Sequence, residues 1–178
     1  MNKLLFLPIA CLFTVATYAN KLHVDSVPAD PKDVSSVNGI IGALYDVISG
    51  DAGVKRNWDR MRTLFIPEGK LTATGKRPDG TGVKRSMSVE DYINTSGLYI
   101  EKNGFFEIEI GRSSHEYGNI VQVFSTYSTK QKSTDTTPFM RGINSIQLWN
   151  DGKRWWIVSV FWQSESKDVP IPEKYINN

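Results

Sequence analysis

Hydrophobic residues recur at helical spacing early in the chain and at strand spacing later. One apolar stripe at i, i+3, i+4, i+7 and i+11 predicts a helix that begins after Asp33 or Ser35, either of which can cap it, and ends at Gly50; it comprises Val37, Ile40, Ile41, Leu44 and Ile48. A second, shorter helix carries Trp58, Met61, Leu64 and Phe65 on one face, and Pro67 ends it.

A third helix is indicated by an N-terminal capping signal. Ser88 and Asp91 have the spacing of a capping box, and Val89, Tyr92 and Ile93 then share an inward face. The helix ends at Gly104. Just before it, residues 71–74 and 83–87 have strand patterns on either side of a turn at residues 78–82, which predicts a hairpin.

The rest of the chain has the pattern of long strands. These are expected at residues 105–117, 120–129, 140–149 and 154–163, separated by turn-forming residues. Three N-terminal helices followed by an antiparallel run predict an α+β fold, in which the helices pack on the concave face of a curved, cone-shaped sheet. Such a cone offers a concave, mostly apolar place for a small molecule.

The N-terminal segment has the features of an export signal. Residues 1–19 combine a positively charged start, an apolar run and small residues before Asn20, which predicts a signal peptide cleaved after Ala19 and a periplasmic or secreted protein. A retained membrane anchor is the alternative, but the apolar run is shorter than the ~20 residues that cross a bilayer. An extended lead-in at 20–33, a domain at 34–165 and a C-terminal tail at 166–178 would follow.

Composition excludes several function classes. The formal charge is +2 over 178 residues, too balanced for a nucleic-acid surface. Cleavage would remove Cys11, the one cysteine, so the mature protein would have neither a disulfide nor a thiol nucleophile. Two histidines without cysteine argue against a zinc site, and nucleotide-binding motifs are absent from the sequence. We therefore expect no metal and no cofactor.

Four stretches of sequence resemble the nuclear transport factor 2-like superfamily, in its SnoaL-like, exported bacterial branch. They are Leu44 to Gly50 with Asn57 to Met61 and Leu64-Phe65, then Ile120 to Tyr127, Arg141 to Leu148 and Asp151 to Val158. The similarity covers most of the chain from Val34 to Tyr175. It implies the cone fold and either acid–base chemistry in the cone or a non-catalytic binding or assembly role. No catalytic set of the superfamily maps onto this chain residue by residue.

Two acidic residues and a histidine are the candidates for proton transfer. Glu107 and Glu109 share one face of a strand at ~6–7 Å spacing, where one carboxyl can act as an acid and the other as a base; alternatively, they form the solvated face of an amphipathic strand. In strict register His115 would share the face of Glu107 and could serve as a general base, although Gly111 favours an intervening bulge.

Aromatic and polar residues elsewhere are candidates for binding. By resemblance Tyr127 faces the cone, where its hydroxyl could donate to an oxyanion, or it is an ordinary buried tyrosine with a satisfied hydroxyl. Arg141 and Gln147 share a strand face and could contact a ligand, or Arg141 could pair with a glutamate and hold strands together. Walls are expected from Tyr45, Trp58 and Tyr92.

The last strand is apolar on both faces. Trp156, Val158, Val160 and Trp162 alternate with Trp155, Ile157 and Phe161, so both faces must be covered. We expect a homodimer through the sheet, with a monomer covered by the tail as the alternative.

The sequence as a whole predicts an exported protein that binds a small, partly apolar organic molecule. Cofactor-free isomerase, dehydratase or hydrolase chemistry would use Glu107 or His115 as the base and Tyr127 as the donor. The alternative is a non-catalytic dimeric module whose cone is filled by its own side chains.

Overall fold

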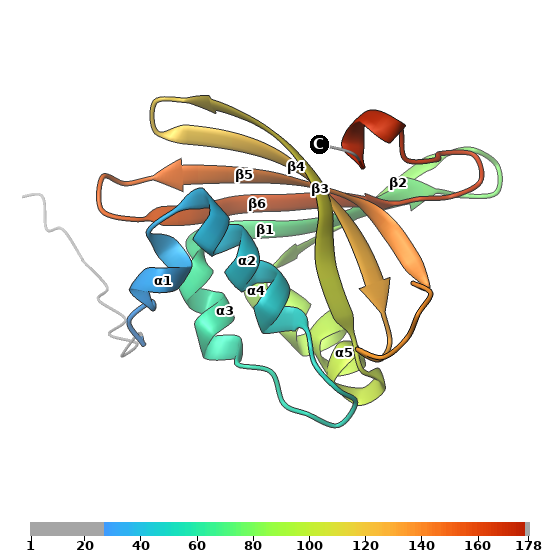
Figure 1. Cartoon of the computed structure of the whole chain (residues 1–178), viewed down its shortest axis with the longest axis horizontal. Coiled ribbons are helices and arrows are strands. Elements are labelled where there is room, and N and C mark those ends of the chain that lie inside the picture. Colours follow the sequence, from blue (N-terminus) through green and yellow to red (C-terminus); the bar gives the residue numbers. More distant parts are fainter. Residues whose placement is uncertain (1–26, 177–178) are drawn as a thin grey trace, which may run out of the picture.

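A computed structural model describes residues 27–176. The predicted signal peptide, residues 1–19, lies outside these residues. Within them no helix is long and apolar enough to cross a membrane. A sheet curls around a group of helices that lies on its concave side (Figure 1).

The first helices follow the predicted stripe but begin differently. A short helix, α1 (Pro31–Val34), starts inside the expected lead-in and is capped by Asp30. The main helix, α2 (Val37–Ile48), is capped by Ser36, which accepts from the amide of Gly39, and not by Asp33 or Ser35. Its stripe is buried apart from a partly buried Val37. The helix α3 (Trp58–Leu64) is shorter and ends where β1 begins.

The predicted third helix is continuous but contains a wider turn. The Ser88–Asp91 capping box opens α4 (Val89–Tyr92), which passes through a π-helical segment, η1 (Ile93–Gly97), into α5 (Leu98–Asn103). A Cβ at Gly97 would lie 2.9 Å from Cζ2 of Trp58, so this glycine lets the tryptophan ring pack against the helix.

Between residues 27 and 176, six strands form a single mixed sheet. They are β1 (Phe65–Lys76), β2 (Gly82–Ser88), β3 (Phe106–Tyr117), β4 (Ile120–Lys130), β5 (Met140–Asn150) and β6 (Trp155–Ser164), in the order β2-β1-β6-β5-β4-β3. Neighbours are antiparallel except for β1 and β6, which run parallel. The α+β fold class and the position of the helices are confirmed.

Two bulges change which side chains face the cone. The β3–β4 register shifts between Glu109 and Gly111, as the glycine suggested, so His115 pairs with Gln122 on the outer face and is exposed. In β6 the register shifts beside Val158. The alternation expected for this strand is therefore wrong: Ile157 is buried on the same side as Val160, and Trp156 lies on the other.

The C-terminal tail crosses the convex face of the sheet. It includes a 3-10 turn, η2 (Glu173–Tyr175), whose Tyr175 ring lies 5.7 Å from that of Phe124. The hydroxyl of Thr126 donates to the carbonyl of Tyr175 at 2.6 Å. A Cβ at Gly111 would lie 3.1 Å from the carbonyl carbon of Tyr175, so glycine allows this close approach. The tail covers part of the face that was expected to need a partner.

Candidate functional site

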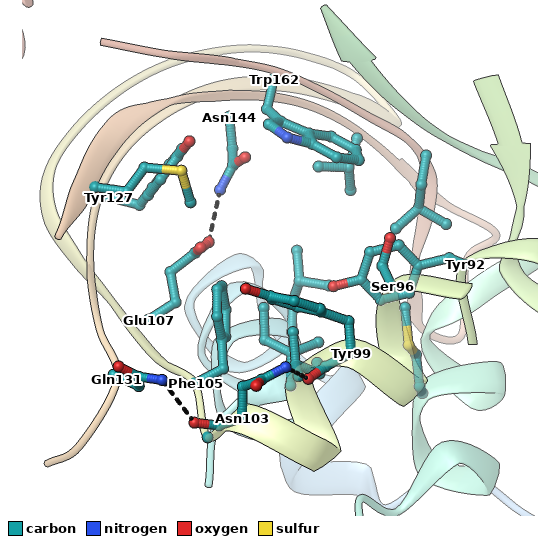
Figure 2. A pocket seen from close by; sticks show the side chains of 18 of the residues that line it. Tyr92, Ser96, Tyr99, Asn103, Phe105, Glu107, Tyr127, Gln131, Asn144 and Trp162 are labelled. Carbon is teal, nitrogen blue, oxygen red and sulfur yellow. Dashed lines mark hydrogen bonds between the residues drawn. The ribbon is translucent and has the colours of Figure 1, made fainter. Parts of the chain in front are cut away.

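A cavity of about 590 Å³ fills the space between the helices and the concave face of the sheet. Its walls are largely apolar, and Glu107, Tyr127, Asn144 and Trp162 from the sheet converge on it with Tyr92 and Tyr99 from the helices (Figure 2). The full lining is Leu44, Ile48, Met61, Leu71, Tyr92, Ser96, Tyr99, Ile100, Asn103, Gly104, Phe105, Glu107, Tyr127, Gln131, Phe139, Met140, Asn144, Val160 and Trp162. The cone is hollow.

Glu107 is the one carboxylate among the described residues that line this cavity, and no lysine, arginine or histidine lines it with Glu107. The residue is 8% exposed. Asn144 Nδ2 donates to Oε1 and Thr129 Oγ1 donates to Oε2, each at 3.2 Å. Burial raises the pKa of Glu107 to about 7, and the two hydrogen bonds oppose that rise. Both protonation states are therefore accessible near neutral pH.

The position of Glu107 follows from the sheet register. Glu107 lies opposite Thr129 on β4, while Asn144 reaches it from β5, one strand further along. Ser49, at the end of α2, accepts from the backbone amide of Glu107 at 3.0 Å, which joins the strand to the helix. Glu109 also faces inward, opposite Tyr127, whereas Ile108 is 55% exposed on the outside. The solvated-face interpretation of the two glutamates is therefore wrong.

Three buried tyrosines surround the carboxylate. Burial is the main cause that raises their pKa values, to about 12 for Tyr127 and further for Tyr45 and Tyr92. All three hydroxyls therefore keep their protons at neutral pH and can donate hydrogen bonds. Tyr127 lies 3.2 Å from Ser164 Oγ, and Tyr45 is bonded behind the cavity wall. Among the described residues, the Tyr92 hydroxyl has no hydrogen-bond partner.

The other sequence candidates lie away from the cavity. Arg141 and Gln147 are on the outer face of β5, where Arg141 donates to Glu165 at 2.9 Å. Trp58 supports α5 by donating from Nε1 to Glu101 at 2.8 Å. Alternation along β5 alone did not tell which of its faces turns inward. The inward set is Gly142, Asn144, Ile146 and Leu148.

Several lining residues were missed from the sequence. Tyr92, which was expected to form a wall, does line the cavity. The missed residues Ser96, Tyr99 and Asn103 follow it at spacings of four, three and four, a helical stripe that could have identified the polar side of the third helix. Asn144 had no signal of its own because its function depends on the neighbouring strand.

Comparison with known proteins is informative at the level of the fold. No family model matches the sequence, and no curated protein matches it. Among solved structures, a nuclear transport factor 2-like superfamily protein from Salmonella enterica matches with a TM-score of 0.52 and 17% identity over 76% of this chain and 92% of that one. The chain has the nuclear transport factor 2-like fold.

Two further structures with a TM-score above 0.5 agree with this fold. A protein of unknown function with a cystatin-like fold from Nostoc punctiforme has a TM-score of 0.56 at 8% identity, over 74% of this chain and 90% of that one. LinA has a TM-score of 0.53 at 7% identity, over 81% of this chain and 92% of that one. At these identities the comparisons show the fold alone.

Proposed function

We propose that the cone binds a small, uncharged and mainly apolar organic molecule and that Glu107 transfers a proton on it. The observation that carries the proposal is the Glu107 carboxylate, buried in a hollow apolar cavity, held by two hydrogen bonds and without a cationic partner among the described residues that line it. A base with a pKa near 7 combines ionisation at neutral pH with useful basicity.

The chemistry suited to these groups is isomerisation through an enolate. The Glu107 carboxylate accepts a proton from the carbon beside a carbonyl. The C–H electron pair forms a carbon–carbon double bond, and the π pair of the carbonyl moves to its oxygen. A hydroxyl of Tyr92 or Tyr127 donates a hydrogen bond to that oxyanion. In a substrate with a double bond between the β and γ carbons, the enolate is conjugated, and Glu107 returns the proton to the γ carbon, so that the double bond moves and no cofactor is consumed. If the β carbon of the substrate instead carries a hydroxyl, transfer of that proton from Glu107 to the hydroxyl lets it leave as water and gives a dehydration.

An uncharged substrate follows from the lining. A carboxylate or phosphate would enter beside ionised Glu107 without a described cation to balance it, and desolvation would oppose its binding. An apolar ring would contact Trp162 and Phe105, with one polar group near Glu107. The alternative of a cone filled by its own side chains is disfavoured by the 590 Å³ cavity.

The test is carbon-bound hydrogen exchange. The protein is incubated in D₂O with a panel of uncharged cyclic and aryl ketones, and deuterium incorporation is followed by mass spectrometry. We expect protein-dependent exchange that Glu107→Gln reduces at least ~100-fold, while His115→Ala, an exposed outer-face variant, retains it. If the wild-type protein binds a ketone but catalyses no exchange, proton transfer by Glu107 is rejected and the cone has a non-catalytic binding role.

Export and self-association are part of the same proposal. We propose that residues 1–19 are removed and that two copies pair through the part of the convex face that the tail leaves exposed, which includes Phe161 (45% exposed) and Trp149 (41%). Native mass spectrometry of protein recovered from a bacterial periplasm tests both. A monomer mass would reject pairing, and an intact Met1 would reject cleavage.

A further inference from the structure

A buried chain of hydrogen bonds connects the cavity carboxylate to the opposite side of the wall. Asn144 Nδ2 lies 3.2 Å from Glu107 Oε1 and 3.1 Å from the Tyr45 hydroxyl. Tyr45 lies 2.6 Å from Ser125 Oγ, which donates to Glu109 Oε1 at 2.5 Å. Four elements contribute to this chain of hydrogen bonds: α2, β3, β4 and β5.

Counting protons fixes the direction of every bond. A carboxylate only accepts, and Arg112 holds that of Glu109 through Nε and a second nitrogen at 2.8 and 2.6 Å. The single proton of Ser125 therefore points to Glu109, and Ser125 accepts from Tyr45. The single proton of Tyr45 is then used as well, so its oxygen can only accept. Asn144 must present its NH₂ group, not its carbonyl oxygen, to Tyr45.

The orientation of the Asn144 side-chain amide determines whether a hydrogen-bond donor or an acceptor faces the Glu107 carboxylate. The two N–H bonds of one amide group serve Tyr45 and Glu107 together. If the amide turned over, its carbonyl oxygen would face Glu107 Oε1 and would favour the protonated carboxyl. The chain of hydrogen bonds from Glu109 through Ser125 to Tyr45 opposes that rotation, because rotation would leave the Tyr45 oxygen without a donor.

We propose that Ser125 and Glu109 are positioning residues that hold the Asn144 amide with its donors toward Glu107, so that this carboxylate remains available as a base. This inference rests on the proposed function of Glu107. Neither residue lines the main cavity; Glu109 and Arg112 lie along a separate cleft between α2 and β3, together with Tyr45 and Asn38.

Other groups also act on Glu107 and must be separated from this effect. The charge of Glu107 interacts with Tyr45 on α2, Tyr92 on α4 and Tyr127 on β4. A second carboxylate, Glu109, lies two residues further along β3. The tyrosines remain neutral near pH 7. Ser125→Ala leaves all these groups and the Glu109–Arg112 pair in place and therefore isolates the orientation of the amide, and a variant without the Tyr45 hydroxyl is compared only with Tyr45→Phe itself.

The experiment is a carboxyl-carbon NMR titration of ¹³C-labelled glutamate in the full chain, with Glu107→Gln identifying the signal. In Ser125→Ala the Tyr45 proton loses its acceptor and can turn to the amide oxygen of a rotated Asn144. We expect the titration midpoint of Glu107 to rise by about 0.7 pH unit, a roughly fivefold increase in proton affinity. Thr126→Val, which removes the outward hydroxyl next along β4, should leave the midpoint unchanged.

A double variant distinguishes orientation from general disturbance. Tyr45→Phe has no hydroxyl proton to drive the rotation, so in Ser125→Ala/Tyr45→Phe the midpoint should return close to that of Tyr45→Phe alone. An unchanged midpoint in Ser125→Ala, or a full shift retained in the double variant, would overturn the inference.

A measurement on the unaltered protein complements the variants. With ¹⁵N-labelled asparagine, both side-chain amide protons of Asn144 should exchange slowly with water and show contacts to Tyr45 and Glu107; a rapidly exchanging pair would contradict the inference. None of these readouts uses a substrate, so the two proposals can fail separately. The D₂O assay can reject proton transfer while the NMR results confirm the positioning of Glu107, or the NMR results can reject the positioning while exchange is observed.

Discussion

Gly142 lies directly opposite Tyr127 in the β4–β5 ladder, and the tyrosine ring occupies the space beside the glycine. A Cβ at position 142 would lie 2.6 Å from Cζ of Tyr127 and 2.5 Å from the carbonyl oxygen of Gln163. The absence of a side chain on β5 thus determines where the hydroxyl of Tyr127 enters the cavity. The backbone of Gly142 has an ordinary φ, so space is the reason for glycine here.

Gly142→Ala should destabilise the protein and displace Tyr127. We expect a loss of about 1–3 kcal/mol in the free energy of unfolding, typical of overpacking, measured by urea denaturation. Gly75→Ala is the matched control, because a Cβ there has no neighbour within 4 Å. Equal stability of the two variants would show that the ring of Tyr127 readily moves aside.

Glu107 should make the protein less stable as the pH rises. Its folded pKa of about 7 is above the unfolded value, so the folded state binds the proton more tightly. Its contribution is fully present below about pH 4 and is lost as the pH rises toward 7, by about 3 kcal/mol in total. Glu107→Gln should remove this dependence and be more stable than the wild type at pH 8.

Urea denaturation at pH 5 and pH 8 measures that difference. Glu116→Gln removes an exposed carboxylate from the same strand and should retain the wild-type dependence. If Glu107→Gln shows the same pH dependence as the wild type, the Glu107 carboxyl is not the group responsible.

The two cavity tyrosines should differ in their effect on catalysis. The Tyr127 hydroxyl is bonded to Ser164, whereas that of Tyr92 has no partner among the described residues. Under the proposed mechanism we expect Tyr92→Phe to lower kcat by ~10-fold or more, through loss of oxyanion stabilisation, and Tyr127→Phe to lower it less. The D₂O exchange assay compares them, and Tyr117→Phe, on an 84% exposed residue, is the control. The opposite ranking would assign the donor to Tyr127.

Arg56 should be a main support of the connection between α2 and α3. Its guanidinium donates to the carbonyl oxygens of Ile48, Gly50 and Val54 at 3.2, 2.5 and 2.6 Å. Lysine cannot reproduce this fork of donors, so Arg56→Lys should lower the free energy of unfolding by about 3 kcal/mol. Thermal unfolding measures this, with the exposed Arg85→Lys as control. A loss within ~0.5 kcal/mol in Arg56→Lys would mean that the carbonyls find water instead.

Local patterns in the sequence were sufficient for most elements. The stripe from Val37 to Ile48, the capping box at Ser88 and the glycine bulge at Gly111 depend on neighbours within a few residues, and all three are present in the structure. The same alternation placed Glu107 and Glu109 on one face of β3. These features were predictable because backbone hydrogen bonding and side-chain periodicity act over short ranges.

Tertiary structure alone decided which face turns inward and what meets there. Periodicity along β3 and β5 cannot tell the concave side from the convex side, and the bulge beside Val158 reverses part of β6. Nor does it bring Asn144, 37 residues away in sequence, to the carboxylate of Glu107. The sequence by itself determined most helices and strands and a short set of candidate site residues. Strand order and sheet curvature decided that Glu107 would be buried in a cavity, because burial depends on all the packed layers together.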